Sequence, residues 1–188
     1  MSKVTPFSRW VELAGSEREP AHGATVGEPA PASESFEVSV KVRRRTPLPR
    51  ITPGPHQHMT HAEFAANHGA DPDDIKKVEA FARHFHLKVQ AALPAERTVL
   101  LEGTAGDFSK AFGVELRTHH LANGQTYRGR VGKISIPSEL EEAVVGVFGL
   151  DNRRVAWPNV RFTQMAAQTE RTAKASPAAQ FQIGRAHV

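Results

Sequence analysis

The sequence of 188 residues has no cysteine and few aromatic residues, with one tyrosine and two tryptophans. Without cysteine it has no disulfide framework, which leaves its cellular compartment open. The N-terminal stretch MSKVTPFSRWVELAG contains no apolar run of about seven residues, so it matches neither a secretory signal nor a membrane span. We therefore expect a soluble chain, whose length suits one domain with tails.

The motifs of common enzyme sites are also missing. The sequence has no G-x-S-x-G, no phosphate-binding loop, no G-x-G-x-x-G and no H-E-x-x-H. His56, His58 and His61 are close together, but no cysteine or well-spaced carboxylate accompanies them, so a solvated loop explains them better than a metal site. Ser109 is predicted on a helix surface without a base. We therefore expect no catalytic residue, no cofactor and no metal in this chain.

Histidines are numerous, with ten in the chain. His119 and His120 are adjacent in a predicted strand, so they point to opposite faces and form no dyad. If several histidines became charged below about pH 6, they could repel a bound body. For any single histidine, a solvated side chain is the simpler interpretation.

The net charge of +4 is confined to the C-terminal part. Residues 151–188 hold six Lys/Arg and two Asp/Glu, so the first 150 residues are neutral overall. A nucleic-acid-binding face would require positive charge clustered on the folded part. A basic tail instead suits a segment lying across an acidic surface, or a solvated linker.

One stretch, TVLLEGTAGDFSKAFGVEL at residues 98–116, carries the clearest structural signals. Thr104 and Asp107 have the spacing of an N-terminal helix cap, and Gly113 follows the apolar helix face as a C-terminal stop. The residues on either side alternate in the manner of strands. The stretch therefore predicts a strand, a short helix and a second strand.

The rest of the chain extends this pattern. Thr60 with Glu63 predicts a helix up to residue 68, and Asp71 with Pro72 starts a longer helix that ends near Phe85. Further strands are predicted at 36–42, 87–93, 133–136 and 143–150, with a hairpin around Asn123-Gly124. The order indicates an α+β, ferredoxin-like antiparallel sheet with two main helices on one face, an extra hairpin, and extended N- and C-terminal tails.

Apolar residues occur on both faces of the predicted sheet. In the last strand Val145 and Val147 alternate with Val144, Phe148 and Leu150. A sheet face open to water would instead alternate to polar residues. We therefore expect a third layer, either the N-terminal arm folded back or a second protein body.

Several segments, in order, resemble the N-terminal activation domain of the sedolisins, the serine-carboxyl peptidases, and among them the kumamolisin-like branch. The most specific are AFGVEL at 111–116, YRGR at 127–130 and GLDNR at 149–153. The similarity covers roughly residues 36–162. In one departure, His86 stands where such domains often have a glycine after the long helix.

The resemblance implies the pro-domain of a secreted, acid-active serine-carboxyl endopeptidase. Such a domain docks on the catalytic domain in the same chain, helps it fold, inhibits it, and leaves after acid-triggered cleavage. The family's catalytic residues and its calcium ligands belong to that following domain. Residues 1–35 would be an extended arm, 36–162 the activation domain and 163–188 the linker, of which 183–188, IGRAHV, resemble translated sequencing adapter. Neither a nucleic acid nor a membrane is expected as a partner.

This interpretation names candidate contact residues. The docking face is assigned to alternate strand side chains, namely Glu37, Ser39, Lys41, Val144, Phe148 and Leu150. In or near the active-site cleft we expect Arg161, at the end of the activation domain, and Arg171 and Lys174 of the linker.

Two other functions fit the same architecture. A ferredoxin-like nucleic-acid-binding module would need paired aromatic residues on central strands, and only Tyr127 and Phe148 are candidates. A small enzyme of acylphosphatase type would need an arginine beside a glycine-rich loop after the first strand, whereas the arginines at 43–45 lead into a proline-rich loop. The fold alone cannot choose among these functions, but the ordered matches favour the activation domain.

Overall fold

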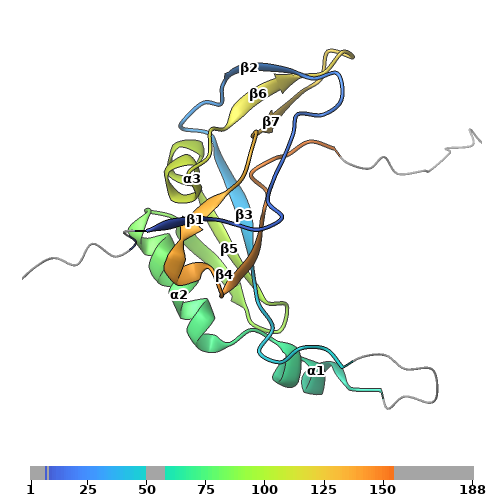
Figure 1. Cartoon of the computed structure of the whole chain (residues 1–188), viewed down its shortest axis with the longest axis vertical. Helices are drawn as coiled ribbons and strands as arrows, with labels where there is room; N and C mark the ends of the chain where they lie inside the picture. Colours follow the sequence, from blue (N-terminus) through green and yellow to red (C-terminus); the bar gives the residue numbers. More distant parts are fainter. Residues whose placement is uncertain (1–6, 8, 50–57, 155–188) are drawn as a thin grey trace, which may run out of the picture. The chain divides into compact units, whose positions relative to one another are not determined.

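The computed structural model describes residue 7 and residues 9–49 and 58–154, and Figure 1 shows their arrangement. The chain divides into two units, Met1–Arg154 and Val155–Val188, and all described residues belong to the first. The elements in chain order are β1 (Trp10–Glu12), β2 (Thr25–Pro29), β3 (Ser35–Val42), α1 (His61–His68), α2 (Pro72–His84), β4 (Lys88–Leu93), β5 (Thr98–Thr104), α3 (Ala105–Phe112), β6 (Arg117–His120), β7 (Thr126–Gly129), β8 (Ser135–Pro137), the short 3-10 helix η1 (Ser138–Leu140) and β9 (Val144–Phe148). In this described part, no helix has the length and apolar character needed to cross a membrane.

Four strands form the main sheet in the order β4-β5-β3-β9, and neighbouring strands are antiparallel. The chain passes from β3 to β4 through α1 and α2, and from β5 towards β9 through α3. Figure 1 shows α2 and α3 on the same side of this sheet. This is the strand order of the ferredoxin-like fold, so the predicted α+β class is confirmed.

The two main helices begin and end where their capping residues predict. At the start of α3 the side chain of Thr104 accepts a hydrogen bond of 3.2 Å from the backbone N–H of Asp107. Gly113 ends that helix in the left-handed region, at φ 59°. Asp71 caps the start of α2 in the same way. After α2 the left-handed position is held by His86, at φ 58°, where a glycine would be less strained.

The hydrophobic core lies between the main sheet and these two helices. Val40 in the centre of β3 pairs with Val99 of β5 and Val147 of β9, and all three side chains are buried. Aromatic side chains of the helices cover them, and Phe81 of α2 meets Phe112 of α3 with ring centroids 5.4 Å apart. Removing this apolar surface from water, at about 25 cal/mol per Å², is the main stabilising contribution.

The N-terminal segment, predicted as an extended arm over residues 1–35, forms strands in two smaller sheets. β1 pairs with β8, and β2 joins the predicted hairpin in the order β2-β6-β7. Phe7 and Trp10 pack against aromatic side chains at α2, so the segment lies partly over the helices. The sequence pattern did not indicate these strands because both are short and β2 contains a glycine and a proline.

A buried carboxylate joins the first turn of α2 to the end of β3. Asp74 is 2% exposed, and its two oxygens accept hydrogen bonds from Arg43 Nε at 2.7 Å and Lys77 Nζ at 3.0 Å. Burial by itself would raise the pKa of the Asp74 carboxyl, but the hydrogen bonds and charges of Arg43 and Lys77 hold it below its ordinary value of 3.8. The carboxylate therefore stays ionised in the folded domain and stabilises it.

Replacing Asp74 by asparagine should lower the free energy of unfolding by about 1–2 kcal/mol near neutral pH, because two charge-assisted hydrogen bonds lose their charge. Since folding depresses this pKa, the contribution is complete above pH 3.8 and is lost as the pH falls below it. Urea unfolding from about pH 7 down to about pH 2 measures it. The exposed neighbour Asp73, replaced by asparagine, is the control. A difference between wild type and Asp74→Asn that stays constant down to the lowest pH contradicts the prediction.

Candidate functional site

The face of the main sheet that points away from α2 and α3, called the open face below, is the first candidate. The register places Ser39, Leu100 and Phe148 side by side across β3, β5 and β9, with Ala91 of β4 beside Leu100. Phe148 is 60% exposed, and its ring lies over Gly146, where a Cβ atom would come within 2.8 Å of it. Leu100 is half-buried. In this row Ser39 lies between Phe148 and Leu100. A large aromatic side chain exposed on a sheet face is typical of a surface that a second protein covers.

Charged and polar side chains border this apolar centre. At one end Glu37 of β3 is opposite Glu102 of β5, and the Glu102 carboxylate lies 3.4 Å from Lys88 Nζ on β4. At the other end Lys41 Nζ donates a hydrogen bond of 2.5 Å to the hydroxyl of Thr98. An apolar centre within a polar rim is the usual arrangement of a protein interface.

Four of the six side chains predicted for docking lie on the open face, namely Glu37, Ser39, Lys41 and Phe148. The predicted orientation of Val144 is wrong, because its side chain is 3% exposed and lies in the core. The register of β9 shifts between the pair of Lys41 with Gly146 and the pair of Val42 with Val144. Val145 is therefore the extra residue of a β-bulge, and the bulge turns Val144 towards the helices.

The predicted orientation of Leu150 is wrong for a different reason. Gly149 follows β9 at φ 104°, a conformation that glycine alone adopts without strain. A Cβ atom there would lie 2.7 Å from the carbonyl oxygen of Glu37. The chain thus turns tightly against β3, and Leu150 enters the core, where it is 2% exposed.

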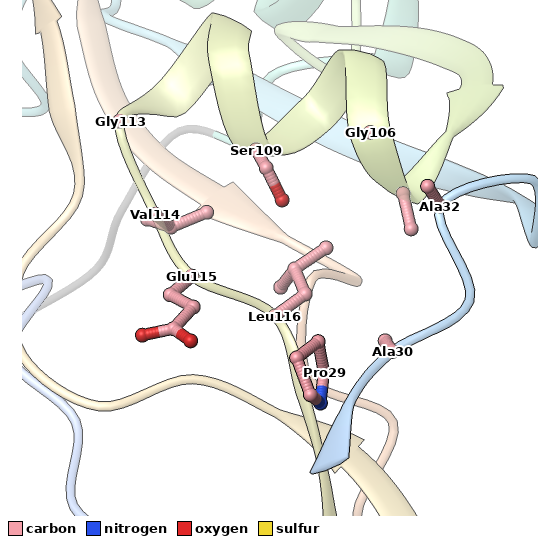
Figure 2. Close-up of a pocket in the computed structure, with 10 residues that line it drawn as sticks. Pro29, Ala30, Ala32, Gly106, Ser109, Gly113, Val114, Glu115 and Leu116 are labelled. Carbon is pink, nitrogen blue, oxygen red and sulfur yellow. The ribbon is translucent and has the colours of Figure 1, made fainter.

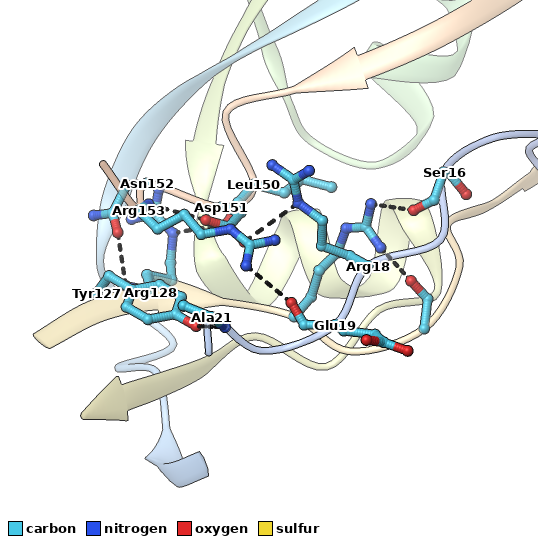
Figure 3. A network of polar contacts seen from close by, with 12 residues as sticks. Ser16, Arg18, Glu19, Ala21, Tyr127, Arg128, Leu150, Asp151, Asn152 and Arg153 are labelled. Atoms are coloured by element: carbon cyan, nitrogen blue, oxygen red, sulfur yellow. Dashed lines mark hydrogen bonds and ion pairs between the residues drawn. The ribbon is translucent and has the colours of Figure 1, made fainter. Parts of the chain in front are cut away.

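The second candidate is a polar network where the chain leaves β9, shown in Figure 3. Arg128 of β7 is 7% exposed, and its guanidinium donates hydrogen bonds to the carbonyl oxygens of Gly149 at 3.1 Å and Leu150 at 3.3 Å. The same group binds the carboxylate of Glu34 and lies 3.4 Å from the centroid of the Phe36 ring. One buried arginine therefore joins the hairpin, the start of β3 and the end of β9.

The segment after β9, residues 149–153 and called the exit segment below, is also held by its backbone. The N–H of Arg128 donates to the side-chain oxygen of Asn152 at 2.7 Å, and the N–H of Asn152 donates to the carbonyl of Arg128 at 3.0 Å. The Asp151 carboxylate lies 3.2 Å from the guanidinium of Arg153 and 3.7 Å from that of Arg18. YRGR and GLDNR, which are distant in sequence, thus meet in one network that includes the N-terminal segment.

Arg130, the last residue of YRGR, also binds the N-terminal segment. It is 7% exposed and donates hydrogen bonds to the carbonyl oxygens of Ser16 and Gly132. Burial lowers the pKa of the Arg130 guanidinium, and the nearby charge of Arg18 acts in the same direction. The arginine alternation in YRGR is therefore a structural feature, since both guanidiniums bind backbone carbonyls inside the domain.

The arginines at 43–45 bind the helical region. Arg43 pairs with Asp74, while Arg44 and Arg45 each donate a hydrogen bond of 3.4 Å to a backbone carbonyl of α1. Residues 50–57 of the following loop lie outside the described residues. These contacts give the three arginines a packing role and do not support a phosphate site of acylphosphatase type.

A groove of about 360 Å³ lies beside α3, and Figure 2 shows the Ser109 hydroxyl pointing into it. The carboxylate of Glu115, another wall residue, binds the guanidinium of Arg117 at 2.8 Å. The first backbone N–H groups of α3, at Ala105 and Gly106, already donate to carbonyl oxygens of the N-terminal segment. Among the described residues, the groove therefore has neither a base for Ser109 nor a free helix end for an anion.

In the described part of the chain, the histidines and aromatic residues noted in the sequence form neither a metal site nor a base-stacking pair. His58 and His61 are exposed, and in the ranges 9–49 and 58–154 no group of three His, Asp or Glu side chains could hold a metal ion. Tyr127 is buried in the β2-β6-β7 sheet, whereas Phe148 belongs to the main sheet, so the two form no base-stacking pair. Three further residues lie outside the described ones, and their role stays a prediction: Arg161, Arg171 and Lys174.

A family model and individual relatives both assign the chain to the same family. The family described as "Pro-kumamolisin, activation domain" matches residues 51–153. Kumamolisin from Bacillus sp. (strain MN-32) is 32% identical over 163 residues, which cover 82% of this chain and 29% of the relative. Tripeptidyl-peptidase sed5 from Aspergillus fumigatus is 25% identical over 164 residues, which cover 75% of this chain and 28% of the relative.

The chain thus spans under a third of the length of either relative. The match to the family includes α1, α2, the main sheet from β4 onward, the hairpin and the exit segment. YRGR and GLDNR, which build the exit network, both fall within it. The chain therefore belongs to the pro-kumamolisin activation domain family and is a pro-domain of the sedolisin type.

Proposed function

We propose that this chain inhibits a serine-carboxyl endopeptidase domain, which follows in the same polypeptide, by docking its open face on the substrate-binding surface. Membership of the pro-kumamolisin family supports a peptidase as the partner. The observation that carries the docking is Phe148, which is 60% exposed on the edge strand β9 of the open face. Such an apolar side chain gains free energy when a second surface removes it from water.

The chemistry of the open face supports a specific contact. A standard inhibitory interface buries about 800 Å² on each partner and takes most of its affinity from a few central apolar anchors. Phe148 and Leu100 are the apolar side chains proposed as anchors on this face. The flanking Glu37 and Lys41 supply charges of opposite sign at the two ends, which would favour one orientation on the partner.

The same contact would assist folding of the peptidase. A surface that binds the folded peptidase and not its unfolded chain stabilises the folded form by mass action. The linker, with Arg171 and Lys174, and Arg161 shortly before it are proposed to pass near the active-site cleft, where cleavage in acid would release the domain. We further propose an extracellular site of action and calcium ligands in the peptidase domain, both by resemblance to the family.

Inhibition in trans tests the proposal. The 188-residue chain is added to mature kumamolisin, freed of its own pro-domain, and hydrolysis of a chromogenic peptide is followed. We expect saturable inhibition near neutral pH and weaker inhibition near pH 4, because protonation of carboxylates and histidines changes both surfaces. The pro-domain of kumamolisin serves as the positive control, and an acid-denatured, aggregated sample of the chain as the negative control.

Unchanged activity in the presence of excess folded chain, when the control pro-domain inhibits, would contradict the proposal. The folding role is measured separately. The peptidase domain is refolded from denaturant with and without the chain, and the yield of activity after acid treatment is compared. A yield that does not depend on the chain removes the chaperone role while leaving inhibition standing.

A further inference from the structure

His119 occupies a position in the domain that costs stability. It lies in β6, opposite Tyr127 of β7 and Val26 of β2, and its side chain is 0% exposed. Its ring stacks on that of Tyr127 with centroids 4.8 Å apart and an interplanar angle of 16°. Neither ring nitrogen has a hydrogen-bond partner among the described residues. A buried polar ring without partners is rare in folded proteins and calls for an explanation beyond packing.

The ring fits tightly between its neighbours. Gly129 of β7 lies against it, and a Cβ atom at Gly129 would come within 3.0 Å of the His119 ring and 2.7 Å of the Tyr127 ring. The ring therefore has little freedom to turn its nitrogens towards solvent while the hairpin is closed. A proton added to His119 would have to stay inside the hairpin or open it.

The charges around His119 do not favour that proton. Arg117 and His120 on β6 and Arg153 on the exit segment oppose a positive ring, and Asp151 is the carboxylate that favours it. Tyr127 is the titratable residue of β7 in contact with the ring, and Glu28 is the only charged residue of β2. Asp151 already pairs with Arg153 at 3.2 Å and Arg18 at 3.7 Å. Burial, together with the charges of Arg153 and Arg117, therefore lowers the pKa of His119 below its ordinary 6.5.

The hairpin that contains His119 also holds the exit segment. β7 lies between β6, where His119 stacks on Tyr127, and the exit segment, where Arg128 and Asn152 exchange two hydrogen bonds of 2.7 and 3.0 Å. The Tyr127 hydroxyl accepts a further hydrogen bond of 2.8 Å from the N–H of Ala21. A displacement of β7 would therefore break contacts of the exit segment and of the N-terminal segment together.

We propose that His119 is an acid-sensitive latch, whose protonation opens the β6–β7 hairpin and frees the exit segment from Arg128 and Asn152. This opening requires no partner protein. Its consequence, that acid loosens the pro-domain on the N-terminal side of the proposed linker, rests on the proposed function. In a zymogen it would couple acidification to release of the pro-domain through one side chain.

The way in which the stability of the closed hairpin changes with pH follows from proton linkage. Because folding lowers the His119 pKa below 6.5, the unfolded or opened form binds more protons than the closed form as the pH falls below that value. The closed form is therefore favoured above 6.5 and loses stability below it, down to the pKa that the closed form retains. Within this window each pH unit changes the ratio of closed to opened hairpin by up to about tenfold.

The test is the pH dependence of unfolding of the 188-residue chain between about pH 7.5 and about pH 4.5, above the range in which carboxylates such as Asp74 titrate. The wild-type chain should lose stability as the pH falls. His119→Phe keeps the stacked ring and removes the titrating group, and His119→Leu is a smaller neutral alternative. Either folded variant should be more stable in acid than wild type and should show a flatter pH profile. The adjacent, exposed His120, replaced by glutamine, should retain the wild-type profile.

Local opening is measured by amide hydrogen exchange at the N–H groups of Arg128 and Asn152, corrected for the intrinsic pH dependence of exchange. Protection in wild type should fall between pH 7 and pH 5, by up to about tenfold for each pH unit below 6.5, and it should persist in a His119 variant. Equal loss of protection in wild type and variants, or none in wild type, overturns the proposal. Neither readout requires a peptidase. A chain that opens in acid but does not inhibit would refute the proposed function and leave this inference intact, whereas an inhibitor with a pH-independent hairpin would do the reverse.

Discussion

Replacing Phe148 by aspartate is expected to weaken inhibition of a kumamolisin-type peptidase by about 30-fold or more. An apolar anchor buried in an interface contributes roughly 2 kcal/mol or more, and aspartate adds the cost of burying a charge without a partner. Because Phe148 is 60% exposed in the free domain, its loss should change the free energy of unfolding little. The inhibition constant near neutral pH, with the urea midpoint measured in parallel, checks both parts of the prediction.

Val131 supplies a matched control. It is 53% exposed, close to the exposure of Phe148, but it lies between β7 and β8, away from the open face. Val131→Asp should leave the inhibition constant within about twofold of wild type, since a charge outside the contact changes affinity little. If both variants lose affinity equally, any added surface charge weakens inhibition and Phe148 has no special role. If Phe148→Asp inhibits as wild type does, the docking surface lies elsewhere.

Replacing Arg128 by methionine is expected to lower the free energy of unfolding by about 2–3 kcal/mol, a factor of roughly 30 to 150 in the folding equilibrium. The carbonyl oxygens of Gly149 and Leu150 would lose their donor, and the carboxylate of Glu34 its cation. Methionine keeps the apolar contact with Phe36, so the loss reports chiefly on the charge and its hydrogen bonds. Urea unfolding followed by circular dichroism measures the change.

Two further variants separate charge from geometry at this site. Arg128→Lys retains the charge but cannot reproduce the forked donor set, so we expect it to recover under half of the loss. Arg117 is an arginine of the same hairpin that binds one backbone carbonyl and one exposed carboxylate, and its side chain is 34% exposed. Arg117→Met should cost under about 1 kcal/mol. If Arg128→Met and Arg117→Met cost the same, the exit network does not have the structural weight assigned to it.

The departures from the predicted docking face have a local cause. Strict alternation along the last strand puts Val144, Phe148 and Leu150 on one side, and it holds for Phe148. A bulge at Val145 and a positive φ at Gly149 reverse the outer two. A single extra residue moves a side chain to the opposite face of a sheet, and the sequence carries no strong local signal for it. Gly149 was visible as a glycine, but its φ follows from the close approach of Glu37.

The two alternatives for a third layer are also resolved in part by the fold. The arm predicted over 1–35 pairs with β6 and β8 and packs at α2, so its described residues do not cover the open face. A second protein body is the remaining alternative. The mixed character of this face, with Glu37 and Lys41 near Phe148, is the character that the proposed docking surface requires.

By itself the sequence determined the helices, their ends and the order of the main strands. Caps such as Thr104 with Asp107, the stop at Gly113 and the alternation of 36–42 act over a few residues, so their physics is contained in a short stretch of chain. Only the tertiary structure decided which surfaces and buried charges result. The sequence does not show the structural roles of Arg128 and His119, because these roles depend on partners that lie up to 94 residues away along the chain. Burial removes the water that would otherwise satisfy such groups, so their energies depend on which distant segments surround them.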